Sequence, residues 1–343
     1  MKISTKEVRN ITGELDQIIE QHKKDNPEQG RDWRTYEQRV ALRVRHAIAR
    51  FEPLIDKAIA ALNISDANNA GNKHALTLKQ RTVLLLTKHL FGKSNREMSA
   101  MLALFSMLSG IDVSYKTVER LYSDEEVAIV LHNLHMLILR EKGIEGVDAS
   151  GDGTGYTLTI KKHYATEAQK FKDKAKDSDK IAKASKQEKG RLLFIYSFAL
   201  MDFTTRLYIA FGTSFKSEQD AYNKAMQMAA ALEIDLKSIR LDRYYSCQQY
   251  ARELGRLYPN VTLYLIPKKN ATVKGPWNWK RTLERFAHNV VAYLKEYFHR
   301  NQSESGFSED KRRFGWRIMQ RKENTINTAQ HLTVIWHNLF WLG

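Results

Sequence analysis

The clearest pattern in the chain is an amphipathic stretch near its C-terminal end. Four apolar residues recur at offsets of four, four and three, which predicts one face of a helix. They are Phe286, Val290, Leu294 and Tyr297. At about 100° per residue, the same face continues through Arg300, Glu304 and Lys311. Because buried charge is costly unless it is paired or bound to metal, this face indicates either a functional site or a helix that bends at Gly306 and leaves its charges in solvent.

The N-terminal part of the chain shows helical periodicity almost throughout. Residues 1–63 predict helices separated by a Pro- and Gly-containing break at residues 26–30. The polar face of the second, long helix is rich in arginine, which is typical of a solvated face or of phosphate contact. The arginines are Arg31, Arg34, Arg39, Arg43, Arg45 and Arg50.

A helix-turn-helix candidate lies at residues 94–123. Ser94 and Glu97 have the spacing of a capping box, and a Gly-containing turn at residues 109–113 precedes a short helix. Hydroxyl and basic residues follow at the start of that helix, the order expected of a DNA-binding helix-turn-helix, although packing in a helical bundle gives the same pattern. The candidate DNA contacts are Ser114, Tyr115, Lys116 and Arg120.

The second half of the chain alternates short strands with helices. Residues 152–160 alternate polar with β-branched and aromatic side chains, which predicts a strand that begins at Asp152. Two apolar runs, 191–201 and 206–215, flank a short turn and predict a hairpin. Strands at 237–242 and 261–266 are joined through a helix and are expected to be parallel.

These patterns predict a mixed α+β or α/β protein in two parts. Residues 1–143 form an all-helical DNA-binding region, and residues 144–343 form a mixed β-sheet flanked by helices. Ten lysines between Lys161 and Lys189, with few apolar neighbours, predict an insertion at 161–190 between two strands.

Composition narrows the class of partner. Among 343 residues, 55 are Lys or Arg and 39 are Asp or Glu, a net charge of +16, which favours a polyanion such as nucleic acid. The single cysteine, Cys247, excludes a disulfide within the chain and a cysteine zinc site. The start of the chain lacks the apolar run of a signal peptide, and the longest apolar run, 192–201, is too short to span a bilayer, so we expect a soluble cytoplasmic protein.

Three carboxylates are expected to meet beside the sheet. Asp152 opens the first predicted strand, Asp242 ends a later one, and Glu304 lies on the final helix. In open α/β sheets, sites form outside the strand ends. Three hard oxygen ligands suit Mg²⁺ or Mn²⁺, and two such ions can clamp the attacking and leaving oxygens of an in-line phosphoryl transfer.

At these residues the chain resembles DDE transposases of bacterial and archaeal insertion sequences. Tyr297, Arg300, Glu304 and Lys311 match every spacing of the Tyr–Arg–Glu–Lys signature of the insertion-sequence-4-like superfamily. Further similarities lie in the Asp-x-Thr opening, in the strand of the second Asp and in the C-terminal tail. They are Asp152-Gly153-Thr154, Asp242-Arg243-Tyr244-Tyr245, Asn327-Thr328-Ala329 and His337-Asn338-Leu339. The resemblance covers about residues 144–343.

The resemblance implies a ribonuclease H-like catalytic domain and a DNA transposase. Asp152, Asp242 and Glu304 would hold two Mg²⁺ (or Mn²⁺) ions, and Tyr297, Arg300 and Lys311 would contact phosphates near the scissile bond. The enzyme would cut double-stranded DNA at the terminal inverted repeats and join the freed 3′-hydroxyl to target DNA. By analogy it would act as a homodimer on DNA.

Several alternatives stay open at the level of sequence. Asp148 competes with Asp152 as the first carboxylate, although the strand and Thr154 favour Asp152. Glu309 and Asp310 compete with Glu304 but lie about 120–140° away from the Tyr297–Lys311 face. A ribonuclease H-like DNA nuclease that does not join strands, or a catalytically silent DNA-binding regulator derived from a transposase, are the alternative functions.

Overall fold

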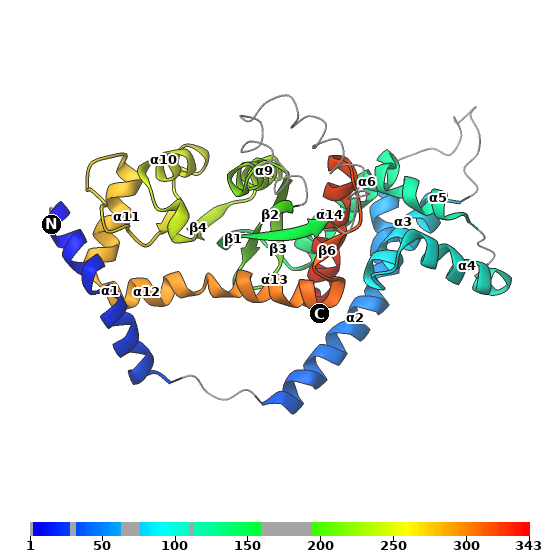
Figure 1. Cartoon of the computed structure of the whole chain (residues 1–343), viewed down its shortest axis with the longest axis horizontal. Coiled ribbons are helices and arrows are strands. Elements are labelled where there is room, and N and C mark those ends of the chain that lie inside the picture. The colour runs from blue at the N-terminus through cyan, green and yellow to red at the C-terminus, as the bar shows by residue number, and fades with distance from the viewer. Residues whose placement is uncertain (1–2, 28–31, 63–75, 110–112, 159–193) are drawn as a thin grey trace, which may run out of the picture.

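The computed structural model describes residues 3–27, 32–62, 76–109, 113–158 and 194–343. Its first part is helical, as predicted (Figure 1). The helices are α1 (Thr5–Asp25), α2 (Trp33–Ala60), α3 (Leu78–Leu90), α4 (Asn95–Ser109), α5 (Tyr115–Arg120) and α6 (Glu125–Glu141), with a short 3₁₀ helix at Leu121–Ser123 between the last two.

A mixed sheet with β1 at its centre follows. The strands lie in the order β3-β2-β1-β4-β5, with β6 paired to the far end of β1. Strands β1, β2 and β3 are antiparallel neighbours, and β4 runs parallel to both β1 and β5. The hairpin of β2 and β3 and the parallel pair of β4 and β5 confirm the predictions. The strands are β1 (Val147–Leu158), β2 (Phe194–Asp202), β3 (Tyr208–Ser214), β4 (Leu236–Arg240), β5 (Thr262–Tyr264) and β6 (Arg317–Ile318). This arrangement is compatible with a ribonuclease H-like fold.

Strand β1 begins earlier than the sequence predicted. Asp152 is its sixth residue, so the prediction that the strand opens at Asp152 was wrong. The glycines of the strand fit the sheet because neighbours fill the space of the missing side chains. A Cβ on Gly151 would lie 2.8 Å from the Phe198 ring, and one on Gly155 would lie 1.7 Å from the Phe194 ring.

Helices cover both faces of the sheet (Figure 1). Helix α9 (Glu218–Ala231) packs on β2 and β3 from one side, with its N-terminus capped by the Ser217 hydroxyl. Helices α12 (Val290–Phe298) and α13 (Asn301–Phe314) lie along the opposite side. The remaining helices are α10 (Gln248–Leu257), α11 (Trp277–His288) and α14 (Glu323–Leu342), with a 3₁₀ turn at Arg243–Tyr245.

The predicted long amphipathic helix is divided into segments. Asn289 is extended (φ −151°), and its side chain accepts a hydrogen bond from the amide of Ala292, so it ends α11 and caps α12. At His299–Arg300 the backbone stays helical, but its hydrogen bonds tighten to a three-residue spacing, as in Arg300 N to Tyr297 O at 3.0 Å. Helix α13 therefore continues α12 along the sheet (Figure 1).

Gly306 does not break the final helix. It lies inside α13, where a Cβ would come within 2.5 Å of the Met201 side chain and 2.9 Å of the Tyr208 hydroxyl. The glycine instead allows α13 to approach the sheet closely. Lys311 consequently stays on the face that the periodicity predicted.

The helix-turn-helix candidate has the expected helix order. Ser94 and Glu97 form the predicted capping box, and Ser114 caps α5 through the amide of Thr117. The centre of the predicted turn, residues 110–112, lies outside the described residues, as does the Lys-rich stretch 161–190.

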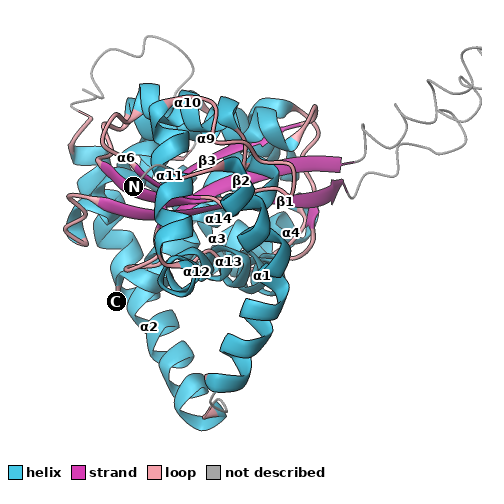
Figure 2. Ribbon diagram, turned by 90° about the vertical axis from the view of Figure 1, so that its left-hand side faces the viewer, coloured by secondary structure: helices cyan, strands magenta, loops and turns pink. Residues whose placement is uncertain are grey.

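The first and last helices lie against elements distant in sequence. Helix α1 packs on α11 and α12, and α14 packs on α2, α3 and α6 as well as on β3. In Figure 2 the lower ends of α1 and α2 extend away from the layers of the sheet. The division of the chain at residues 143 and 144 into two domains stays a prediction.

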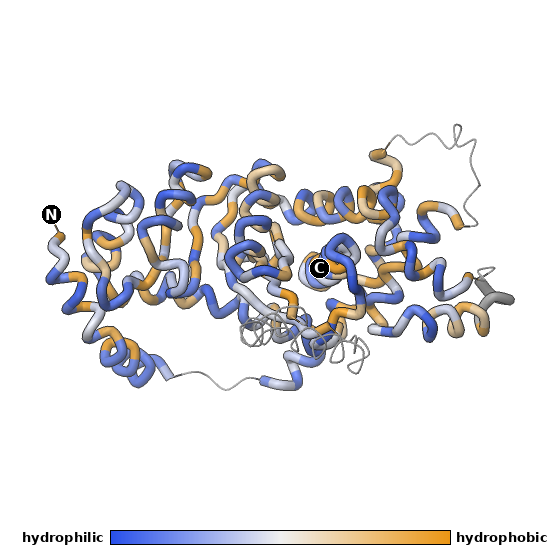
Figure 3. Tube along the Cα trace, turned by 45° about the horizontal axis from the view of Figure 1, so that its top comes forward, coloured by the Kyte–Doolittle hydropathy of each residue, from blue (hydrophilic) through white to orange (hydrophobic). Residues whose placement is uncertain are grey.

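Hydrophobic and hydrophilic positions alternate along the helices (Figure 3). The largest buried cluster joins both parts of the chain, from Val8 and Leu85 through Phe198 and Ile239 to Leu339. Within the described ranges, no helix is long and apolar enough to cross a membrane.

Candidate active site

The register of two parallel strands places the first two candidate carboxylates side by side. Ser150 of β1 pairs with Arg240 at the end of β4. Asp152 and Asp242 each follow two residues later, so both lie at the end of β4, on the side of the sheet that faces α12 and α13. The Asp242 carboxylate accepts a hydrogen bond from the amide of Arg243 at 2.6 Å, which orients it at the start of the 3₁₀ turn.

Arg300 connects the first carboxylate to the third. Its Nη1 lies 3.4 Å from Oδ2 of Asp152, and its Nη2 lies 2.5 Å from Oε1 of Glu304, one helical turn further along the chain. The Arg300 and Asp152 side chains are mostly buried, whereas that of Glu304 is 48% exposed. The site therefore has a desolvated floor at the sheet and an open side at Glu304.

The pKa of Asp152 is shifted by its burial and by the charged groups around it. Burial raises the pKa of its carboxyl group to about 6. The Arg300 guanidinium and the Gly153 amide act in the opposite direction, while the charges of Glu304 and Asp242 raise the pKa further. The negative charges of all three candidate carboxylates thus act on one another.

The donor set fits a divalent cation chemically. Three carboxylates supply hard oxygen ligands, and a divalent cation would offset the burial and repulsion that raise the pKa of Asp152. In the described residues, however, no three His, Cys, Asp or Glu side chains are gathered tightly enough to hold a metal ion. The Arg300 guanidinium lies between Asp152 and Glu304, so an ion shared by these two would have to displace it.

Tyr297 and Lys311 flank the carboxylates along α12 and α13. Tyr297 is 6% exposed, and burial raises the pKa of its hydroxyl to about 12. The Arg300 guanidinium lies 6.0 Å from the centre of its ring. Lys311 donates a hydrogen bond to the Thr154 hydroxyl at 2.5 Å, and burial lowers its pKa. All four residues of the Tyr–Arg–Glu–Lys spacing therefore lie along the same side of the sheet.

The competing carboxylates have other partners. Asp148 accepts a hydrogen bond from the Ser238 hydroxyl within the sheet. Glu309 pairs with Arg313 on its own helix at 3.1 Å. Asp310 is buried and is held by the Tyr208 hydroxyl and His337 Nδ1, each at 2.9 Å. This geometry favours Asp152 and Glu304 over the three alternatives.

The four candidate DNA contacts at α5 differ in their exposure and in whether other groups of the protein already engage them. Lys116 and Arg120 are exposed and lie one helical turn apart, while buried Val118 anchors the helix. Ser114 is engaged as the helix cap, and the guanidinium of Arg96 lies 5.1 Å from the Tyr115 ring. Lys116 and Arg120 are therefore the better placed of the four for phosphate contact.

Two supporting contacts were not foreseen. The Asn338 side chain bonds both the amide and the carbonyl of Tyr208, at 2.7 and 2.8 Å, which fixes α14 to β3. The rings of Phe203 and His299 stack at 4.5 Å between the β2–β3 turn and the joint of α12 and α13. Only the first contact has a signal in the sequence, because His337 and Asn338 belong to the tail that resembles the transposases.

Comparison with known proteins identifies the family of the chain. No family model and no solved structure matches the chain. A curated protein of Archaeoglobus fulgidus, named "Probable transposase for insertion sequence element ISA1214", is 40% identical over 342 residues. The match covers 99% of this chain and 97% of that protein. The chain therefore belongs to the family of insertion-sequence transposases that this relative represents.

Proposed function

We propose that the chain is a metal-dependent DDE transposase that cuts DNA at the ends of an insertion sequence and joins them to target DNA. The observation that supports this most is the convergence of Asp152, Asp242 and Glu304 on one side of the sheet around Arg300. The match to the Tyr–Arg–Glu–Lys signature and the family membership point to the same chemistry.

Each residue has a distinct role in this proposal. Asp152, Asp242 and Glu304 would hold two Mg²⁺ or Mn²⁺ ions, which when bound supply an activated water and neutralise charge on the phosphate. Arg300 would exchange its bonds to Asp152 and Glu304 for a two-pronged contact with a phosphate near the scissile bond. Lys311, held beside Thr154, would contact a neighbouring phosphate as a point charge.

Residues that surround the site hold its side chains in place. Tyr297 is buried behind Arg300 and limits the positions of its guanidinium. The Nη2 of buried Arg240 lies 2.5 Å from Oε2 of Glu296, whose side chain is 44% exposed, and this ion pair fixes α12 to β4 beside Asp242. The helices that bear Arg300 and Glu304 are thus held to the strands that bear the two aspartates, which favours a fixed arrangement over a flexible one.

A strand-transfer assay tests the function as a whole. Purified protein is incubated with Mg²⁺, a target plasmid and duplexes that carry the element's inverted repeats with free 3′-hydroxyls. A transposase joins the duplex to the plasmid. A nuclease of the same fold nicks DNA without joining it, and a DNA-binding regulator does neither.

A further inference from the structure

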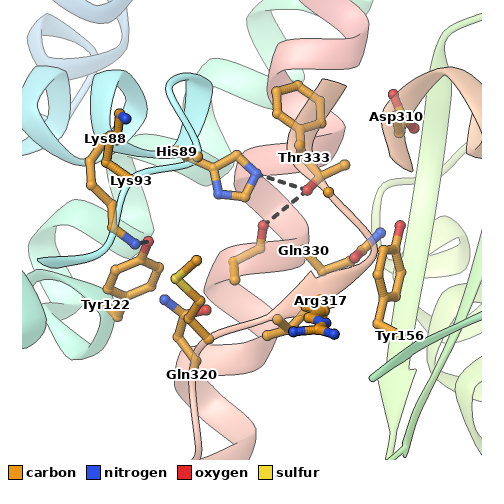
Figure 4. A pocket seen from close by; sticks show the side chains of 16 residues that line it. Lys88, His89, Lys93, Tyr122, Tyr156, Asp310, Arg317, Gln320, Gln330 and Thr333 are labelled. Carbon is orange, nitrogen blue, oxygen red and sulfur yellow. Dashed lines mark hydrogen bonds between the residues drawn. The ribbon is translucent and has the colours of Figure 1, made fainter. Parts of the chain in front are cut away.

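A small cavity lies away from the carboxylate site, where α3, α14 and the segment after α13 meet (Figure 4). Its volume is about 50 Å³. One water position needs about 10–15 Å³, so the cavity has room for roughly three to five water-sized atoms. That number matches the oxygen atoms around one phosphorus or sulfur atom.

The floor of the cavity holds a buried lysine. Lys88 is 4% exposed, and its Nζ donates a hydrogen bond to the Tyr122 hydroxyl at 2.6 Å (Figure 4). Burial lowers the pKa of the ammonium to about 8, so it stays largely charged at neutral pH. None of the described carboxylates forms an ion pair with it. A buried charge with one neutral partner is costly, and an anion in the cavity would offset that cost.

Other groups around the cavity favour an anion. His89 is neutral, because burial lowers its pKa to about 3, and it is bonded to the Thr333 hydroxyl at 2.9 Å. Gln320 and Gln330 supply amide groups, and the exposed side chains of Lys93 and Arg317 add positive charge.

The carboxylate of Asp310 lines the cavity, but it does not make the net charge of the lining negative. Both oxygens of Asp310 are occupied, by the Tyr208 hydroxyl and by His337. Burial lowers the pKa of His337, but the charge and hydrogen bond of Asp310 outweigh it and raise the pKa overall. His337 Nδ1 faces Asp310 and its Nε2 faces the Arg206 carbonyl, and two acceptors fit a protonated imidazole that offsets the charge of Asp310. Lys88, Lys93 and Arg317 then set the sign of the cavity.

The cavity shares a neighbour, Tyr156, with Lys311 of the candidate active site. Lys311 lies 4.9 Å from the centre of the Trp316 ring and 5.1 Å from that of Tyr156. Tyr156 lines the cavity, and Arg317 follows directly after Trp316, which is 61% exposed. The exposed side chains of Trp316 and Arg317 thus present aromatic and basic surface next to Lys311 and the cavity, as on surfaces that bind a nucleic-acid strand, whereas Tyr156 is buried.

We propose that this cavity binds a phosphoryl group, with Lys88 as its buried counter-ion and Arg317 at its entrance. The group is either a free phosphate or a backbone phosphate of bound DNA. Only the second source rests on the proposed function. The binding itself is independent of metal and of catalysis, so it can hold even if strand transfer fails.

The experiment measures thermal unfolding of the full chain with inorganic phosphate and with chloride at matched ionic strength. At a tenfold excess over its dissociation constant, phosphate should raise the Tm of the wild type by about 2 °C. Lys88→Met removes the charge at similar length and should abolish this shift. Lys237→Met is the matched control, because Lys237 is exposed at the opposite end of β4 from Asp242.

Binding to duplex DNA, measured over a range of salt concentrations, identifies the source. If the group is a DNA phosphate, Lys88→Met lowers affinity and reduces the salt dependence by about one ion. If it is free phosphate, duplex affinity is equal in both proteins. Should Lys88→Met fail to fold, the exposed Arg317→Gln replaces it and should lower phosphate affinity several-fold. The proposal is overturned if neither probe distinguishes the cavity variants from the wild type, or if Lys237→Met shows the same losses.

Discussion

The guanidinium of Arg300 joins the carboxylates of Asp152 and Glu304, with Nη1 3.4 Å from the first and Nη2 2.5 Å from the second. We predict that Arg300→Ala lowers the rate of Mg²⁺-dependent nicking by about 100-fold or more, the usual cost of losing one donor to a developing negative charge. Arg300→Lys keeps the charge but not the two-pronged geometry and should be intermediate. Single-turnover nicking of an end duplex measures both.

The matched control for Arg300 is Arg312→Ala. Arg312 lies on α13, which begins directly after Arg300, is exposed, and donates only to the Ser308 carbonyl in the described contacts. Its removal should change nicking little. Wild-type rates in Arg300→Ala would show that the guanidinium has no part in the reaction.

The pKa of Asp152 makes stability depend on pH in a defined direction. Its folded value is about 6 against an ordinary value of 3.8, so the folded state holds this proton more tightly than the unfolded state. The resulting stabilisation is present below about pH 4 and is lost as the pH rises through about 6, a change of about 3 kcal/mol. Asp152→Asn does not ionise and should not show this loss.

Urea unfolding without divalent metal, at about pH 4 and about pH 8, tests this prediction. The stability of Asp152→Asn relative to the wild type should increase toward the higher pH. Added Mg²⁺ should reduce the difference, because a bound cation favours the ionised carboxylate. Parallel pH profiles for the two proteins would refute the assigned environment of Asp152.

Close approach of α13 to the sheet depends on Gly306. A Cβ there would lie 2.5 Å from the Met201 side chain and 2.9 Å from the Tyr208 hydroxyl. We predict that Gly306→Ala lowers the free energy of unfolding by about 1–3 kcal/mol through overpacking. Gly13→Ala in α1 is the control, since no atom lies within 4 Å of the added carbon. It should stabilise the protein by about 0.5–1 kcal/mol. Equal effects at the two sites in urea unfolding would contradict the packing argument.

The exposed pair Lys116 and Arg120 tests the helix-turn-helix candidate. Lys116→Ala combined with Arg120→Ala should weaken binding to the inverted repeats and lower the salt dependence by about two ions. Lys237→Ala with Lys295→Ala removes the same charge from exposed positions elsewhere. Footprints on the element's ends measure the binding, and salt titrations of the same complexes measure the salt dependence. An unchanged footprint in the α5 variant would place the DNA-binding surface on another element.

Much of the fold could be predicted because short-range sequence patterns favour the same helices, strands and turns that the whole structure contains. The hairpin of β2 and β3, the capping box at Ser94 and the parallel pair β4 and β5 all follow from short-range signals. The start of β1 could not be predicted, since whether Gly151 belongs to a strand depends on neighbours such as Phe198, which are distant in sequence. For the same reason the break at Asn289 was missed: the apolar spacing continues across it.

The candidate site was predictable in its residues but not in its contacts. Helical spacing placed Arg300, Glu304 and Lys311 on one face, and the structure leaves them there. Spacing could not show that Arg300 would lie between two carboxylates, because that depends on how closely α13 approaches β1. The buried network of Asp310, Tyr208 and His337 likewise joins three elements and has no local signal.

We propose that Asp242 is one of three carboxylates that hold the catalytic metal ions. Asp242→Asn removes one negative charge and keeps the side-chain oxygen that accepts from the Arg243 amide. The decisive measurement is Mg²⁺-dependent nicking of an end duplex by this variant, with binding to the same duplex measured in parallel. The proposal predicts that binding is retained and nicking is abolished. Nicking at the wild-type rate would contradict it.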